Sequence, residues 1–154
     1  MATFVLPVHL MSTITVTRKF LIVLSLVALL PTVSAAQVTF ERLLNADDEP
    51  HNWLTYSGGY SSNRHTKLDQ IHADNVDDLE LSWVFQASSL EAFQATPLVV
   101  DGIMYLTEPV NNVVALDAKR GSVFWKYEYT PSSQARPCCG AVNRGLAILN
   151  DTLF

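Results

Sequence analysis

Two adjacent cysteines, Cys138 and Cys139, are the residues whose type and spacing most directly suggest chemistry, and they are the only cysteines in the sequence. Neighbouring Cα atoms lie about 3.8 Å apart across a trans peptide, whereas ordinary disulfides join Cα atoms roughly 4.4–6.8 Å apart. A bridge between these two therefore requires a strained or isomerised peptide, and such strain tends to occur at functional sites. The alternative is a pair of buried thiols that pack as small apolar groups. The dipeptide alone leaves both interpretations open.

The first 36 residues have the pattern of a secretory signal peptide. Arg18 and Lys19 precede an apolar run over residues 20–30, and the small residues 34–36 follow as an A-x-A-like cleavage site. The apolar run is shorter than the roughly 20 residues that a membrane-spanning helix needs. We therefore predict that residues 1–36 are a cleaved leader and that no membrane span remains after cleavage.

The predicted export of the chain and its net charge limit the classes of function that fit the sequence. Met11 is an alternative start, and residues 37–154 would form the mature chain in an oxidising space, where a disulfide persists. This context favours the Cys138–Cys139 bridge. The formal net charge is −5, and the predicted leader removes two cations and no acid. A negative chain of this kind argues against partners such as nucleic acids or anionic membrane surfaces.

The rest of the sequence predicts short strands and tight turns. Apolar runs at 97–100 and 103–106 flank Asp101-Gly102, which is a strong hairpin signal. Further strands are expected over 81–86, 113–116, 122–129 and 146–154, the last interrupted by a turn at Asn150-Asp151, with Val123, Trp125, Tyr127 and Tyr129 on one face of their strand. Two short helical turns are expected, at 40–44 and at 75–79, the second with Asn75 as its cap. The predicted fold class is all-β.

The strands have the spacing of a repeat. Trp83 and Trp125 are 42 residues apart, which lies within the usual propeller period of about 40–50 residues. Residues 146–153 repeat the pattern of residues 99–106, as if a further repeat began there. Little more than two blades are present, and two blades leave open sheet edges. We therefore expect the chain to be the N-terminal fragment of a longer propeller.

The repeat resembles a known family. Residues 115–125 (ALDAKRGSVFW) resemble the tryptophan-docking repeat of the quinoprotein alcohol dehydrogenases, which are eight-bladed β-propellers that carry pyrroloquinoline quinone (PQQ). Four other stretches also resemble the family, namely 53–64 (WLTYSGGYSSNR), 68–76 (LDQIHADNV), 95–105 (ATPLVVDGIMY) and 138–147 (CCGAVNRGLA). The resemblance implies that the chain holds the first blades of such a propeller.

The resemblance also implies roles for particular residues. Cys138 and Cys139 match the vicinal disulfide that packs against one face of the quinone, and Arg144 matches an arginine that contacts the quinone oxygens. A guanidinium is a fixed cation with directed donors and suits charge that develops on a reduced quinone. Gln94 stands where many members carry a cofactor-binding glutamate, and it can form hydrogen bonds but carries no charge.

The function that the resemblance implies is that of a periplasmic PQQ-dependent dehydrogenase. In the family, hydride passes from an alcohol to the quinone, an aspartate acts as base and calcium or another metal polarises the quinone. The base and the metal ligands are expected beyond Phe154, so we assign neither a catalytic residue nor a metal ligand within the chain. A periplasmic cytochrome c or a similar electron acceptor is the expected partner.

The alternative is a non-catalytic propeller that acts as a scaffold in envelope protein assembly. It predicts a lipid-anchor cysteine and no Cys-Cys pair, whereas this sequence has the opposite on both counts.

Overall fold

The structure, a computed structural model, describes residues 37–136, 138 and 140–154. The predicted signal peptide, residues 1–36, lies outside the described residues, and so does Cys139. In the described part of the chain, no helix has the length and apolarity needed to cross a membrane.

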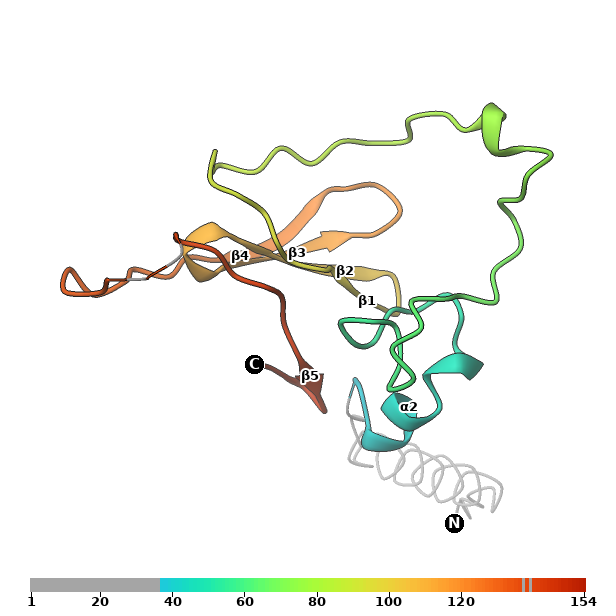
Figure 1. Cartoon of the computed structure of the whole chain (residues 1–154), viewed down its shortest axis with the longest axis horizontal. Helices are drawn as coiled ribbons and strands as arrows, with labels where there is room; N and C mark the ends of the chain where they lie inside the picture. The colour runs from blue at the N-terminus through green and yellow to red at the C-terminus, as the bar shows by residue number, and fades with distance from the viewer. Residues whose placement is uncertain (1–36, 137, 139) are drawn as a thin grey trace, which may run out of the picture. The chain divides into compact units, whose positions relative to one another are not determined.

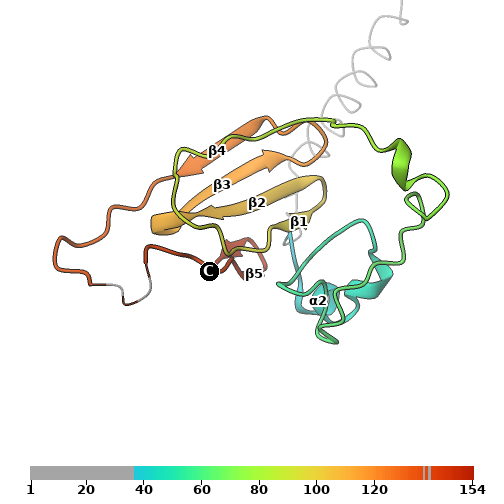
Figure 2. The ribbon, with the colours of Figure 1, turned by 45° about the horizontal axis from the view of Figure 1, so that its top comes forward.

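An antiparallel meander of four strands is the main element (Figure 2). It consists of β1 (Leu98–Val100), β2 (Ile103–Glu108), β3 (Asn112–Asp117) and β4 (Val123–Tyr127), with the short 3-10 helix η3 (Pro109–Asn111) between β2 and β3. Asp101 and Gly102 join β1 to β2 with positive φ angles of 50° and 82°. Both central residues of a type I′ turn need positive φ, which Asp-Gly tolerates. The predicted hairpin is therefore confirmed.

A register shift in β4 corrects one expectation. Ala115 pairs with Trp125, whereas the next residue, Leu116, pairs with Val123. Because neighbouring residues of β3 face opposite sides of the sheet, their partners Val123 and Trp125 also face opposite sides. The prediction that Val123 shares a face with Trp125 is wrong, because the irregularity between them breaks the alternation.

The helices are short and lie outside the sheet. They are α2 (Phe40–Leu44), η1 (Ala46–Asp48) and η2 (Val76–Asp78), so both predicted helical turns are confirmed. Thr39 caps α2, because its Oγ1 accepts from the Arg42 N–H. The expected side-chain cap at η2 is wrong. Asn75 instead accepts from the His72 N–H and donates to the Gln70 carbonyl, so its amide closes the turn that precedes the helix.

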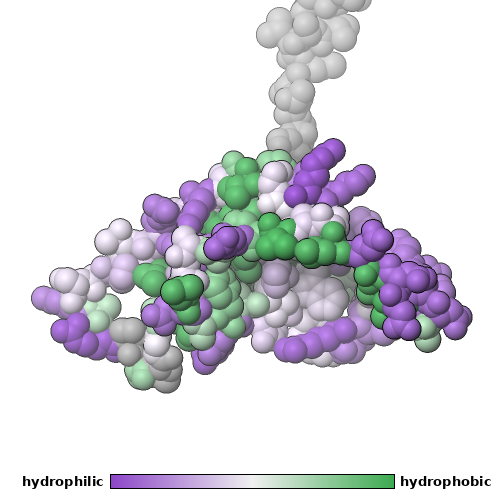
Figure 3. Space-filling model, turned by 90° about the horizontal axis from the view of Figure 1, so that it is seen from above, coloured by the Kyte–Doolittle hydropathy of each residue, from purple (hydrophilic) through white to green (hydrophobic). Residues whose placement is uncertain are grey.

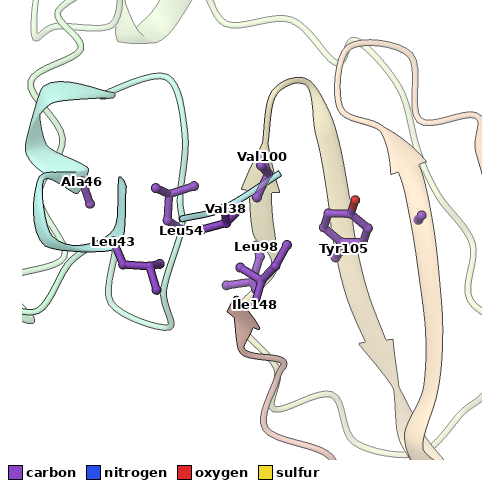
Figure 4. Packing of buried hydrophobic residues seen from close by; sticks show 9 residues of the cluster. Val38, Leu43, Ala46, Leu54, Leu98, Val100, Tyr105 and Ile148 are labelled. Atoms are coloured by element: carbon purple, nitrogen blue, oxygen red, sulfur yellow. The ribbon is translucent and has the colours of Figure 1, made fainter. Parts of the chain in front are cut away.

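One face of the sheet forms the hydrophobic core. A short hairpin of β5 (Ile148–Leu149) and β6 (Thr152–Leu153) packs there, and Val38 forms a bridge with Asn150 in its turn. Figure 4 shows the buried side chains meeting between β1, β2, β5 and the α2 segment. They are Val38, Leu43, Ala46, Leu54, Leu98, Val100, Tyr105, Ala115 and Ile148.

Arg42 connects α2 to the first hairpin turn. Its Nη2 lies 2.8 Å from Asp101 Oδ1 and 2.6 Å from Glu49 Oε2. Hydrogen bonds from Arg42 hold the pKa of Glu49 and that of Asp101 below their ordinary values, and the same contacts raise the pKa of Arg42. The cluster fixes the N-terminal segment on the sheet with a paired, half-buried cation.

The segment between η2 and β1, residues 79–97, covers the other face of the sheet and is here called the covering segment (Figure 1). Its Trp83 packs on Gly121, and its Ser88 contacts Glu108, which follows core-facing Thr107 and so points away from the core. The expected strand over 81–86 is wrong: these residues have no strand partner in the described chain, and an extended segment without a partner makes no ladder. Seen from this side, the surface carries a band of hydrophobic residues (Figure 3). The exposed apolar side chains of the segment include Leu79, Leu81, Val84 and Leu90.

Candidate functional site

Three segments that are distant in the sequence meet at the loop that carries the cysteines, here called the cysteine loop (residues 138 and 140–145). Thr96, just before β1, forms a parallel bridge with Gly145. The N–H of Val110, in η3, donates a hydrogen bond of 2.9 Å to the carbonyl of Ala141. The cysteine loop is therefore held between the start of β1 and the turn that joins β2 to β3.

Asn143 ties this loop at two points. Its Nδ2 donates to Asn111 Oδ1 at 2.8 Å, and its Oδ1 accepts from the Gly145 N–H at 2.8 Å. Gly145 has a φ of +121°, and a Cβ there would lie 3.3 Å from the carbonyl oxygen of Thr96. The close approach of the two segments therefore favours glycine at this position.

Sequence reasoning missed Asn111 and Asn143. An asparagine two residues before a glycine is typical of a turn in which the side chain accepts from the backbone, so the bond to Gly145 had a local signal. The contact with Asn111 had none, because the two asparagines are separated by 32 residues.

The predicted cofactor-binding residues Gln94, Cys138 and Arg144 are all exposed. Gln94 lies two residues before Thr96, and Arg144 directly precedes Gly145, so the Thr96–Gly145 bridge places their segments side by side. Cys138 forms a backbone bridge with Gly140. The predicted Cys138–Cys139 disulfide involves a residue outside the described ones.

Two arginines near the loop differ in their contacts. Arg136 donates to the carbonyls of Ser133 and Ala135, so its guanidinium is engaged within its own turn. Arg144 forms no hydrogen bond or ion pair with another described residue, and the same holds for the amide of Gln94. Both side chains are available to a ligand. The described residues contain no group of three or more His, Cys, Asp or Glu side chains that could hold a metal ion.

Two cavities border the same region. One, of about 430 Å³, lies between η3, the segment that follows β4 and the cysteine loop, and Val110, Tyr129 and Ala141 are among its lining residues. The other, of about 530 Å³, lies between β3, β4 and the β5–β6 hairpin, and its walls include Trp125, Asn143 and Gly145. Gln94 and Arg144 line neither cavity, although the Thr96–Gly145 bridge places their segments side by side.

Comparison with known proteins shows to which family the chain belongs. Residues 53–153 match the family described as "PQQ: Glucose/ethanol/alcohol dehydrogenase, beta-propeller domain". The chain belongs to this family. The predicted membership and the all-β propeller class are thereby confirmed.

Curated relatives are dehydrogenases. The chain is 43% identical over 118 residues to the dehydrogenase subunit of the alcohol dehydrogenase (quinone) of Acetobacter aceti, covering 75% of this chain and 16% of the relative. It is 41% identical over 123 residues to the quinohemoprotein alcohol dehydrogenase ADH-IIG of Pseudomonas putida, covering 77% and 17%. The chain thus spans about one sixth of the length of these relatives. Names of this kind do not favour the scaffold alternative.

Solved structures agree. The quinohemoprotein alcohol dehydrogenase ADHIIG of Pseudomonas putida HK5 matches with a TM-score of 0.70 and 38% identity, over 77% of this chain and 18% of that one. A europium-containing methanol dehydrogenase matches with a TM-score of 0.68 and 36% identity, over 74% and 21%. Each of the two matches covers about three quarters of this chain.

Proposed function

We propose that this chain supplies one side of the PQQ site of a periplasmic dehydrogenase that oxidises alcohols by hydride transfer to the quinone. The observation that carries the proposal is the Thr96–Gly145 bridge in a chain of this family. It brings Gln94 and Arg144 to adjacent segments, each with a side chain that has no partner among the described residues. When bound, PQQ supplies the two-electron acceptor of the reaction.

The residues present fit a planar, anionic quinone. Arg144 offers a cation with directed donors, and its position on the cysteine loop orients it through Asn143 and Gly145. Gln94 offers one amide acceptor and two N–H donors, so it can bond either a carbonyl or a carboxylate of the cofactor. Cys138 and Cys139, joined as a vicinal disulfide, would supply the apolar surface on which the ring stacks.

The remaining parts of the site belong to other segments of the whole protein. The catalytic base and the ligands of calcium or another metal lie outside this chain in the proposal, and one of the similar structures is named for a europium-containing enzyme. The electron acceptor is a cytochrome c or a similar periplasmic carrier. Two relatives carry the word quinohemoprotein in their names, which supports electron transfer to haem.

The chain forms the first blades of an eight-bladed propeller in this proposal, with residues 1–36 as a leader for export. Every residue of β4 is exposed, including Trp125 at 43% and Tyr127 at 56%. Exposed aromatic surface of this extent is typical of an interface. Neighbouring blades of the same protein would cover it and would also give the segment over residues 81–86 a strand partner.

The experiment is titration of the whole protein with PQQ in the presence of calcium, followed by dye-linked oxidation of a series of small alcohols. Quinone absorbance that saturates at one cofactor per protein, together with alcohol-dependent dye reduction, is the expected result. A protein that binds no PQQ and reduces no dye would overturn the proposed function.

A further inference from the structure

Glu108, the last residue of β2, is a buried carboxylate that the proposed function does not use. Its side chain has an exposed fraction of 0%. Carboxylates are almost never completely buried unless they are paired, because water solvates the charge so much better than the protein interior. Burial of this charge therefore calls for an account of its partners.

Lys126 of β4 and Ser88 of the covering segment are those partners. Lys126 Nζ forms an ion pair with Glu108 Oε2 at 2.9 Å, and it donates a hydrogen bond of 2.9 Å to Ser88 Oγ. The backbone N–H of Ser88 donates to Glu108 Oε1 at 3.4 Å. The carboxylate holds the pKa of Lys126 above its ordinary value. The three groups join β2, β4 and the covering segment at one end of the sheet.

This end of the sheet is where the cysteine loop is held. Val110 and Asn111 follow Glu108 by two and three residues, and they provide the two hydrogen bonds that reach Ala141 and Asn143. Both have positive φ angles, 70° and 66°. A β-branched residue such as Val110 rarely adopts the left-handed conformation, so the surroundings must impose it.

We propose that the Glu108–Lys126 ion pair positions the cysteine loop for binding of the cofactor. The pair anchors the strained Val110-Asn111 turn, and this turn holds the cysteine loop through hydrogen bonds to Ala141 and Asn143. The inference rests on the proposed function for the identity of the ligand, but the anchoring itself concerns this chain alone. Glu108 is buried whereas Lys126 reaches the surface, and an ion pair that takes a charge out of water adds little net stability compared with a well-packed apolar pair. The Glu108–Lys126 pair lies beside the strained turn, so its effect is on the conformation of that turn. Glu108 and Lys126 are therefore positioning residues that do not touch the cofactor.

The test compares Lys126→Met with Lys126→Arg in the whole protein. Methionine leaves the Glu108 carboxylate without its cation, whereas arginine keeps the pair. Amide hydrogen exchange without cofactor is measured at Val110 and Gly145, whose N–H groups bond within the loop junction. We expect exchange about tenfold faster in Lys126→Met and close to the wild-type rate in Lys126→Arg. The dissociation constant of PQQ should rise about tenfold in Lys126→Met alone.

Val100→Ala serves as the matched control, because Val100 is buried in the same sheet at the distant Asp101-Gly102 turn. It should lower the melting temperature without changing exchange at Val110 or Gly145. If Lys126→Met does not fold, the double variant Glu108→Gln/Lys126→Gln replaces the ion pair by a neutral pair and is measured in its place. Unchanged exchange in the variant without the ion pair, or equally faster exchange in Val100→Ala, would overturn the inference. A wild-type protein that binds no PQQ would overturn the proposed function, while the exchange data would still decide whether the pair positions the loop.

Discussion

Trp83 packs so closely on Gly121 that a Cβ built on this glycine would stand 2.6 Å from Cδ2 of the indole. Gly121 ends the turn from β3 to β4 with a φ of +70°, and its N–H donates to the carbonyl of Asp117. The contact joins the covering segment to the turn of the sheet. Because the indole occupies the space of a side chain, the sheet and its covering segment depend on glycine here.

Gly121→Ala should therefore destabilise the protein by about 2 kcal/mol or more, since alanine adds both a left-handed backbone cost and a clash with Trp83. Gly102→Ala is the matched control: its φ is +82°, and a Cβ there meets no atom within 4 Å. It should show only the backbone cost, about 1 kcal/mol. Chemical unfolding of both variants measures the difference, and equal losses would show that Trp83 moves aside freely.

Arg42→Met should lower stability by about 1–2 kcal/mol near neutral pH, because it removes a half-buried cation that bonds Glu49 and Asp101. The pKa values of both carboxyls are held down in the folded state, so their contribution is present above their unfolded pKa values and is lost as pH falls through the folded ones. The difference between wild type and Arg42→Met should shrink below about pH 4. Arg120→Met, which removes a cation that is itself mostly exposed from its pair with Asp117, should have a much smaller effect. A gap that stays constant down to acid unfolding would contradict this account.

Arg144→Ala should weaken PQQ binding roughly 10- to 100-fold, because the cofactor loses a charged hydrogen-bond donor. Arg144→Lys keeps the charge but not the planar guanidinium group, so its affinity for PQQ should lie between those of wild type and Arg144→Ala. Arg136→Ala removes a nearby guanidinium that bonds its own turn and should leave binding unchanged. Titration of the whole protein measures all three, and equal affinities for wild type and Arg144→Ala would remove Arg144 from the site.

Gln94→Glu tests the departure from the resemblance to the family. A carboxylate at this position should maintain or tighten PQQ binding if Gln94 contacts the cofactor, because it adds a strong acceptor next to the Arg144 segment. Glu91→Gln provides a control for charge in the same segment and should have no effect. Loss of binding in Gln94→Glu would contradict this prediction and would indicate that Gln94 donates to an acidic group, such as a carboxylate of the cofactor.

The export and the vicinal disulfide can be tested together on secreted protein. Sequencing of the mature N-terminus should begin at Ala36 or Gln37, and alkylation without reduction should label neither Cys138 nor Cys139. Replacing both cysteines by serine should impair PQQ binding and dye-linked alcohol oxidation. A mature protein that begins at Met1 or Met11, or thiols that are labelled without reductant, would contradict these predictions.

The sequence by itself determined the features whose causes lie within a few residues. Asp101-Gly102 dictates the tight turn of the first hairpin, and Thr39 and the residues after it dictate α2, because backbone preferences and caps act locally. The resemblance of local motifs to the family likewise led to the prediction of Gln94, Cys138, Cys139 and Arg144 as cofactor-binding residues, without knowledge of how the chain folds.

Only the tertiary structure decided which distant groups meet. Nothing near Glu108 predicts Lys126 as its partner, nothing near Asn111 predicts Asn143, and the apolar run at 81–86 does not show in advance that it lacks a strand partner in the described chain. Such contacts depend on the path of the whole chain, and the shift in register that turns Val123 away from Trp125 depends on pairing with β3. Local preference selects the elements, whereas burial and pairing across the sheet select their neighbours.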